Sequence, residues 1–299
     1  MSPEVSAETL RACIDRQGDA PALVVAEDSG TTAYRELGAR VDELAGQLSA
    51  VGVARGATVA LVLPNGPEFV EVLLAISTLG AIAAPLNPAY TRDEHRFYLD
   101  DLRPAVLVLA VGETPAAREA CSAATRIVEA VIDQKAGLGL SADGEPVEAV
   151  TGYDIAAPDD IALLLHTSGT TSRPKQVPLT HRNLLASART IAAFYELTPS
   201  DVSFCVMPLF HVHGLVASTL APLVSGGTVV VARRLAPRRF WGQLEQRGVT
   251  WLSAGPTLHH MLVERADPDR ARLVRFARSC SSALSAELFA RCEEAYGAP

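Results

Sequence analysis

A run of small and hydroxyl residues near the middle of the chain has the composition of a phosphate-binding loop. The segment from His166 to Lys175 reads H-T-S-G-T-T-S-R-P-K and directly follows the apolar stretch 161–165. Gly169 permits close backbone approach to a ligand, the hydroxyl side chains can donate to phosphate oxygens, and Lys175 supplies a mobile positive charge. The alternative is a polar surface turn, since Ser, Thr, Gly and Pro are common in turns. The order of the residues, with an expected strand before and a helix after, favours phosphate binding.

This loop differs from the Walker A motif, G-x-x-x-x-G-K-[ST], at two positions. Pro174 stands where the motif has its second Gly, and Gln176 stands where it has a hydroxyl residue. Pro has no backbone N–H to donate to a phosphate, and a Gln side chain replaces a magnesium-binding hydroxyl poorly. The next helix is expected only after its cap at Thr180, so a phosphate on this loop would not lie on a helix N-terminus. We therefore exclude an ordinary P-loop NTPase.

Histidine pairs and scattered cysteines offer a second kind of chemistry. His211 and His213, together with His259 and His260, could supply four metal ligands. No Asp, Glu or Cys stands at a supporting spacing, which disfavours a zinc site. Each histidine can also cap a helix or be satisfied in the core. Cys280 is expected to be a small buried residue, because no sequence partner suggests an activated thiol.

Short apolar runs alternate with amphipathic segments along the whole chain. Strands are expected at 22–26, 58–63, 81–85, 105–109, 161–165, 202–206, 228–232, 249–253 and 274–279. Helices are expected at 34–50, 67–79, from about 91, 180–195, 211–224, 237–247, 256–265 and 285–295. This alternation predicts an α/β fold with parallel-rich sheets flanked by helices in a layered arrangement. The polar segment 135–160 lacks a helical face and is interpreted as a connection between a first α/β subdomain (about 1–150) and a second (160–299) that carries the loop.

Composition limits the class of protein. The 299 residues carry a net charge of −8 and no concentrated basic stripe, which argues against a nucleic-acid partner. The five cysteines are scattered without a C-x-x-C pair, which is typical of a reducing compartment. Neither a secretory signal nor a transmembrane segment is expected, so a cytoplasmic enzyme is predicted.

The loop and the residues after it resemble a known family. T-S-G-T-T-x-x-P-K followed by V-P-L-T-H is similar to the signature of the adenylate-forming (acyl-CoA synthetase, AMP-binding) superfamily, and the longer run looks closest to oxalyl-CoA synthetases and 4-coumarate-CoA-ligase-like enzymes. The resemblance implies a ligase that uses ATP, Mg²⁺ and coenzyme A to activate a carboxylic acid. It implies that the triphosphate is bound by Thr167, Ser168, Gly169, Thr170, Thr171 and Lys175, with Thr170 as a weak candidate for contact with Mg²⁺.

Three further segments extend the resemblance. Residues 207–214 (M-P-L-F-H-V-H-G) resemble the family's PLFHxxG segment, which makes His211 the candidate catalytic residue beside an acyl pocket that includes Gly214. Gly255 begins a G-P-T turn that borders the same pocket in the family. Residues 279–284 take the place of the SGAAPL loop, which implies that Cys280, Ser281 and Ser282 lie along the nucleotide and that Ser281 also borders the acid.

Several family motifs are not found in these 299 residues. They include the YGxTE glutamate, the ribose-binding aspartate and the C-terminal lysine. We therefore expect an N-terminal part of the AMP-binding domain, without the C-terminal lid domain and inactive in isolation. Two alternatives stay open: an adenylation domain that loads a carrier-protein thiol, and a non-catalytic nucleotide-binding or scaffold protein. Gln176 gives the latter some support, because the family usually has Gly there. The acid and a possible homodimer are not determined by the sequence.

Overall fold

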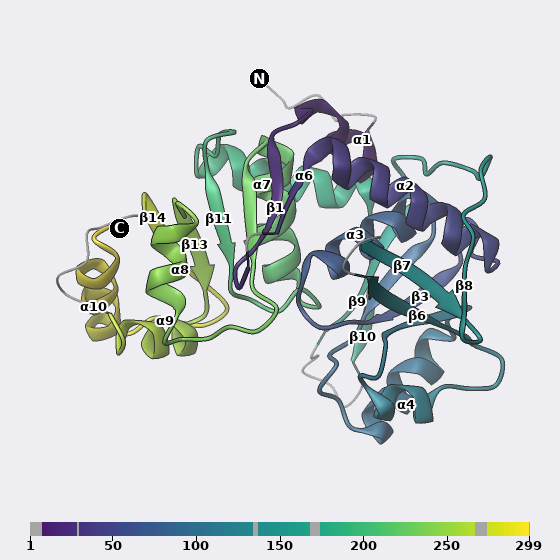
Figure 1. Cartoon of the computed structure of the whole chain (residues 1–299). Helices are drawn as coiled ribbons and strands as arrows, with labels where there is room; N and C mark the ends of the chain where they lie inside the picture. Colours follow the sequence, from purple (N-terminus) through teal and green to yellow (C-terminus); the bar gives the residue numbers. More distant parts are fainter. Residues whose placement is uncertain (1–7, 29, 134–136, 168–173, 267–273, 299) are drawn as a thin grey trace. The chain divides into compact units, whose positions relative to one another are not determined.

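The computed structural model describes residues 8–298, apart from 29, 134–136, 168–173 and 267–273. The chain forms two compact units (Figure 1). The first comprises Met1–Arg16, Arg35–Pro64 and Glu68–Ala186, and the second comprises Gln17–Tyr34, Asn65–Pro67 and Ser187–Pro299. The chain finally passes from the first unit to the second after Ala186, so the strands on either side of the expected phosphate loop belong to the first unit.

The first unit contains an eight-stranded sheet in the order β10-β9-β4-β3-β5-β6-β7-β8. Its strands are β3 (Thr58–Val62), β4 (Ile82–Pro85), β5 (Val106–Ala110), β6 (Arg126–Asp133), β7 (Gly137–Ala142), β8 (Glu145–Pro146), β9 (Ile161–Thr167) and β10 (Lys175–Thr180). Neighbours from β9 to β6 are parallel, whereas β10, β7 and β8 are attached antiparallel. The helices are α1 (Leu10–Ile14), α2 (Tyr34–Ala50), α3 (Pro67–Thr78), α4 (Arg92–Leu102), α5 (Pro115–Ala120) and the first part of α6 (His181–Phe194), which continues into the second unit, with a 3₁₀ turn at Asp15–Gln17.

Both faces of the central strands β3, β4 and β5 are buried, as is usual for parallel strands. One face packs against α4 and α5 through a cluster that includes Ala60, Leu107, Leu109, Leu99 and Ala117. The alternate strand residues, which point to the opposite face, are also fully buried: Val59, Leu61, Ala83 and Val108. This explains why these strands are continuous apolar runs in the sequence rather than alternating patterns.

The second unit contains a six-stranded sheet in the order β14-β13-β11-β12-β1-β2. Its strands are β1 (Pro21–Val25), β2 (Thr31–Ala33), β11 (Val202–Cys205), β12 (Thr228–Val231), β13 (Trp251–Ala254) and β14 (Phe276–Ser279). All neighbours are parallel except β1 and β2. A π-helix, η2 (His213–Leu220), and the helices α7 (Ala221–Ser225), α8 (Phe240–Gln246), α9 (Pro256–Val263) and α10 (Ala286–Tyr296) complete the unit.

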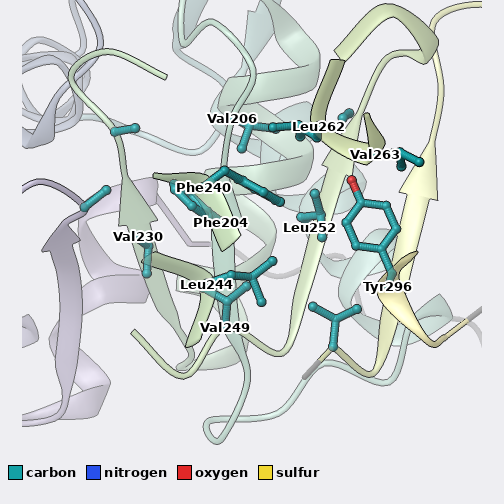
Figure 2. Close-up of a cluster of buried hydrophobic side chains, with 14 of the residues drawn as sticks. Phe204, Val206, Val230, Phe240, Leu244, Val249, Leu252, Leu262, Val263 and Tyr296 are labelled. Atoms are coloured by element: carbon teal, nitrogen blue, oxygen red, sulfur yellow. The ribbon is translucent and has the colours of Figure 1, made fainter. Parts of the chain in front are cut away.

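The core of the second unit lies between its sheet and the helices α8, α9 and α10 (Figure 2). Phe204 of β11 stacks on Phe240 of α8, with ring centroids 5.5 Å apart. Leu252 of β13, Leu262 of α9 and Tyr296 of α10 pack in the same cluster. The core therefore connects α10 to β11 and β13, two of the strands that candidate site residues follow.

The predicted α/β class with parallel-rich, helix-flanked sheets is confirmed, and three local expectations are corrected. The segment 135–160 is not only a connection, because it contains β7 and β8. A strand, β10, occupies 175–180 and ends at the cap residue Thr180, and the helix expected from 211 begins at His213 as a π-helix. In the part of the chain that the structure describes, no helix is long and apolar enough to cross a membrane.

Candidate active site

The expected phosphate loop connects the two strands of an antiparallel hairpin in the first unit. In the register of β9 and β10, Thr167 pairs with Lys175 and His166 pairs with Gln176. The Thr167 hydroxyl lies 3.5 Å from the Lys175 carbonyl oxygen. Ser168, Gly169, Thr170 and Thr171 lie outside the described residues. The structure thus brings the two ends of the expected loop together and leaves the Lys175 side chain exposed.

One carboxylate attaches this hairpin to the end of α4. The Gln176 side-chain N–H₂ donates to Asp101 Oδ2 at 2.8 Å and to the Asp101 carbonyl oxygen at 3.1 Å. His166 Nε2 lies 3.0 Å from the same Oδ2 atom, and the His166 ring packs edge-on against Tyr98. Because His166 and Gln176 face each other across the hairpin, Asp101 fixes both strands just before the loop. Gln176, where the family usually has Gly, therefore has a structural partner.

The site residues of the second unit lie at one edge of its sheet. Gly255 and Cys280 directly follow β13 and β14, and His211 comes six residues after the end of β11, so all three come after the carboxyl ends of parallel strands. The Cys280 N–H donates to the Ala254 carbonyl oxygen at 3.1 Å, which holds the last two segments side by side. Ligands of open α/β sheets bind at this edge. The structure thus gathers the three segments that the sequence predicted to line an acid and nucleotide pocket.

At this edge His213, rather than His211, is the histidine that belongs to a hydrogen-bond network. His213 Nε2 lies 2.7 Å from Ser253 Oγ, and its Nδ1 lies 2.8 Å from Cys280 Sγ. Burial, assisted by the nearby Arg278, lowers the pKa of His213 to about 4, so the ring is neutral at pH 7. His211 is exposed, and its ring packs against Phe210. Neighbouring residues still exclude part of the water around the His211 ring, and this partial desolvation lowers its pKa as well.

Sequence reasoning named His213 only as a possible metal ligand, and it missed Ser253 and Arg278 as candidate site residues. Arg278 Nη1 donates to Ser253 Oγ at 3.1 Å, which extends the network to a charged group. The H-x-H pattern places two histidines in the same segment, but only their burial in the folded chain shows which of them joins the hydrogen-bond network.

Cys280 also differs from expectation, since His213 is a close partner for its thiol. His259 Nδ1 lies 3.2 Å from the Tyr296 hydroxyl and its Nε2 lies 3.1 Å from the Arg278 carbonyl oxygen, as expected for a core histidine.

Backbone geometry around the network requires particular residues. A Cβ atom at Gly214 would lie 2.3 Å from the Pro208 carbonyl oxygen, so only glycine fits where η2 begins. Ser281 adopts a left-handed conformation with φ of +77°, an arrangement that is uncommon for residues other than glycine and is concentrated at functional sites. Ser281 and Ser282 are exposed. Among the residues that the structure describes, no three His, Cys, Asp or Glu side chains gather as metal ligands.

Comparison with known proteins identifies the family. Residues 10–299 match the family model described as AMP-binding enzyme. The chain belongs to the AMP-binding enzyme family. It is 42% identical to an oxalate–CoA ligase of Arabidopsis thaliana over 260 residues, covering 84% of this chain and 51% of that protein. It is 33% identical to a sulfoacetate–CoA ligase of Cupriavidus necator, covering 93% of this chain and 55% of that protein.

Two solved structures have a similar fold. ATP-bound MatB from Rhodopseudomonas palustris aligns with a TM-score of 0.81 at 24% identity, covering 98% of this chain and 58% of that chain. O-succinylbenzoate coenzyme A synthetase (MenE) from Bacillus subtilis, in complex with AMP, aligns with a TM-score of 0.80 at 27% identity, covering 98% of this chain and 72% of that chain. The chain spans about half the length of the curated relatives it matches.

Proposed function

We propose that the chain is part of an ATP-dependent acid–CoA ligase that works through an acyl-adenylate. The observation that carries this proposal is the hairpin of β9 and β10, which places Lys175 opposite Thr167 at the ends of a hydroxyl-rich loop in a member of the AMP-binding family. A lysine beside hydroxyl and backbone donors is suited to bind a polyphosphate. The names of the relatives, which are CoA ligases, favour CoA over a carrier protein as the acyl acceptor.

The reaction joins two anions and therefore needs charge neutralisation and positioning. A carboxylate oxygen of the acid attacks the α-phosphorus of ATP, and pyrophosphate leaves; the thiol of CoA then displaces AMP from the acyl group. Mg²⁺, when bound, would neutralise phosphate charge, and Thr170 is the residue we propose for contact with it. In the first unit, residues 167–171 and Lys175 would bind the triphosphate.

In the second unit, Cys280, Ser281 and Ser282 would lie along the nucleotide, and Gly214, Gly255 and Ser281 would border the acid. His211, neutral at pH 7 because surrounding protein lowers its pKa, would contact the acid by hydrogen bonding rather than by charge. We also propose that the acid is small. Two of the relatives are named for oxalate and sulfoacetate, which are both short acids with two acidic groups.

Exchange of labelled pyrophosphate into ATP tests the reaction, because exchange requires reversible formation of an acyl-adenylate. We expect the protein that contains this chain to catalyse exchange when a small carboxylic acid is present and not when it is omitted. We expect no exchange from the 299-residue polypeptide alone, since the glutamate and lysine that the resemblance implies for this step are not among its residues. Acid-independent exchange, or none with any small acid, would contradict the proposed reaction.

Alkylation of Cys280 tests the nucleotide site on the 299-residue chain itself. Cys280 and Cys121 are the two cysteines that are not buried. We expect ATP at about ten times its Kd to slow the reaction of Cys280 with iodoacetamide about tenfold, because only the free fraction reacts. Cys121 lies in the first unit outside the candidate site, so its rate should not change. The measurement is mass spectrometry of the two labelled peptides, and equal Cys280 rates with and without ATP would count against the assignment.

A further inference from the structure

We propose that Arg278 binds the second anionic group of a small acid that carries two negative charges, and that it thereby selects such acids over monoanionic ones. This inference rests on the proposed function for the role of the acid as substrate. It goes beyond that function because it specifies the net charge of the substrate and the residue that recognises this charge.

Arg278 lies at the ligand-binding edge of the second sheet. It stands next to the last residue of β14 and is the register partner of Ser253 in β13. Its Nη1 donates to Ser253 Oγ, which also lies 2.7 Å from His213 Nε2. The guanidinium carbon lies 5.9 Å from the centre of the Tyr195 ring, and the residue is only partly exposed. The side chain is therefore held beside the segments that carry Gly214, Gly255 and Ser281.

The guanidinium group of Arg278 has no anionic partner in the described part of the chain. A guanidinium has five N–H donors, and in the described part of the chain the Arg278 side chain donates to the neutral Ser253 hydroxyl. Arg275, three residues earlier, is satisfied by contrast. Its Nη2 lies 3.2 Å from Asp201 Oδ2, and it donates to the carbonyl oxygens of Tyr195 and Glu196. A half-buried cation without a carboxylate is a suitable site for an anionic ligand.

The other titratable groups of this cluster do not supply positive charge at neutral pH. Burial lowers the pKa values of His213 and His259, and surrounding protein lowers that of His211. Arg278 is therefore the permanent cation of the network that includes Ser253, His213 and Cys280. In a reaction at one carboxylate, a second acidic group on the same small molecule would need its own counter-charge. Arg278 can provide this charge with a planar, two-pronged donor set.

The test compares oxalate with oxamate, in which an uncharged amide replaces one carboxylate at almost the same size. Binding of each to the 299-residue chain is measured by isothermal titration calorimetry. We expect oxalate to bind at least about tenfold more tightly than oxamate, as is typical of a hydrogen bond between two charged groups. Arg278→Gln should weaken oxalate binding by about tenfold or more and leave oxamate binding within about twofold. Arg278→Lys should restore part of the preference, because it keeps the charge but not the planar donor set.

Arg275→Gln is the matched control, since it removes a guanidinium group near the start of the same strand that is already paired with Asp201. We expect it to leave the oxalate-to-oxamate preference unchanged, and thermal unfolding of each variant reports whether the fold is retained. An unchanged preference in Arg278→Gln, equal binding of the two acids, or no binding of either would overturn the proposal. If that happens while ATP still protects Cys280, the proposed function stands. If oxalate binds through Arg278 but ATP does not protect Cys280, the proposed nucleotide site fails and this inference stands.

Discussion

Gly214→Ala is expected to lower the free energy of unfolding of the chain by about 3 kcal/mol or more. A Cβ atom at this position would lie 2.3 Å from the Pro208 carbonyl oxygen, 2.8 Å from its carbonyl carbon and 2.9 Å from the Met207 carbonyl oxygen. All three are backbone atoms, so no flexible side chain can move aside to relieve the overlap. The first turn of η2 would have to shift, and His213 would shift with it. Urea-induced unfolding followed by fluorescence gives the free energy directly.

Gly255→Ala is the matched control in the same unit and at the same sheet edge. There a Cβ atom would meet only the Cys280 carbonyl oxygen, at 3.7 Å, which is an ordinary contact. We expect this change to alter the free energy of unfolding by less than about 1 kcal/mol. If Gly214→Ala were as stable as Gly255→Ala, the close approach of η2 to the segment 207–208 would not exist in solution. The position of His213 in the site would then need another cause.

Lys175→Ala is expected to weaken ATP binding to the chain by about tenfold to a hundredfold, which corresponds to the loss of a charge-assisted hydrogen bond to a phosphate. Lys175 is exposed at the first position of β10, opposite Thr167 across the hairpin. The loss should be accompanied by a weaker dependence of ATP binding on salt, because one fewer charge attracts the triphosphate. Calorimetric titration with ATP at two salt concentrations measures both effects. An affinity within twofold of the unchanged chain would remove Lys175 from the triphosphate site.

Two variants separate the charge of Lys175 from other effects. Arg182→Ala also removes one positive charge from the first unit, but Arg182 is already paired with Asp159 at 2.8 Å. We expect it to leave ATP affinity unchanged. Gln176→Gly removes the two hydrogen bonds to Asp101 without removing charge. We expect Gln176→Gly to weaken ATP binding by only about threefold. It detaches the hairpin from Asp101 but leaves the proposed phosphate-binding groups in place.

Much of the secondary structure of this chain is encoded locally, and there the sequence predicted it well. The spacing of Leu37, Val41, Leu44 and Leu48 predicts a helix over 34–50, and the structure has α2 at Tyr34–Ala50. Thr180 caps the next helix as predicted, since its hydroxyl accepts from the Asn183 N–H at 3.1 Å. Such signals need only the neighbouring residues, so they can be recognised without a fold.

Strands whose own residues carry a weak pattern, and which form by pairing with a neighbouring strand, were missed. β10 contains Pro178, and its alternation is confined to Val177 and Leu179, which are partly buried on either side of this exposed proline, so its sequence signal is short and weak. It is a strand because β9 offers it a paired edge, and an edge strand tolerates proline. β7 was assigned to a connection because Gly137 and Gly139 weaken its pattern, but its pairing with β6 makes it a strand.

The sequence by itself determined the α/β class, the family resemblance, and the segments that could bind ATP and an acid. The tertiary structure alone decided which strands share a sheet: β1 pairs in parallel with β12, with Leu23 opposite Val229, in the second unit rather than the first. It also decided that His213 rather than His211 enters a buried network, and that Arg275 has a carboxylate partner among the described residues whereas Arg278 does not. Residue type and spacing specify local conformation and the available chemistry. Burial and pairing depend on contacts between residues far apart in the chain, which only folding creates.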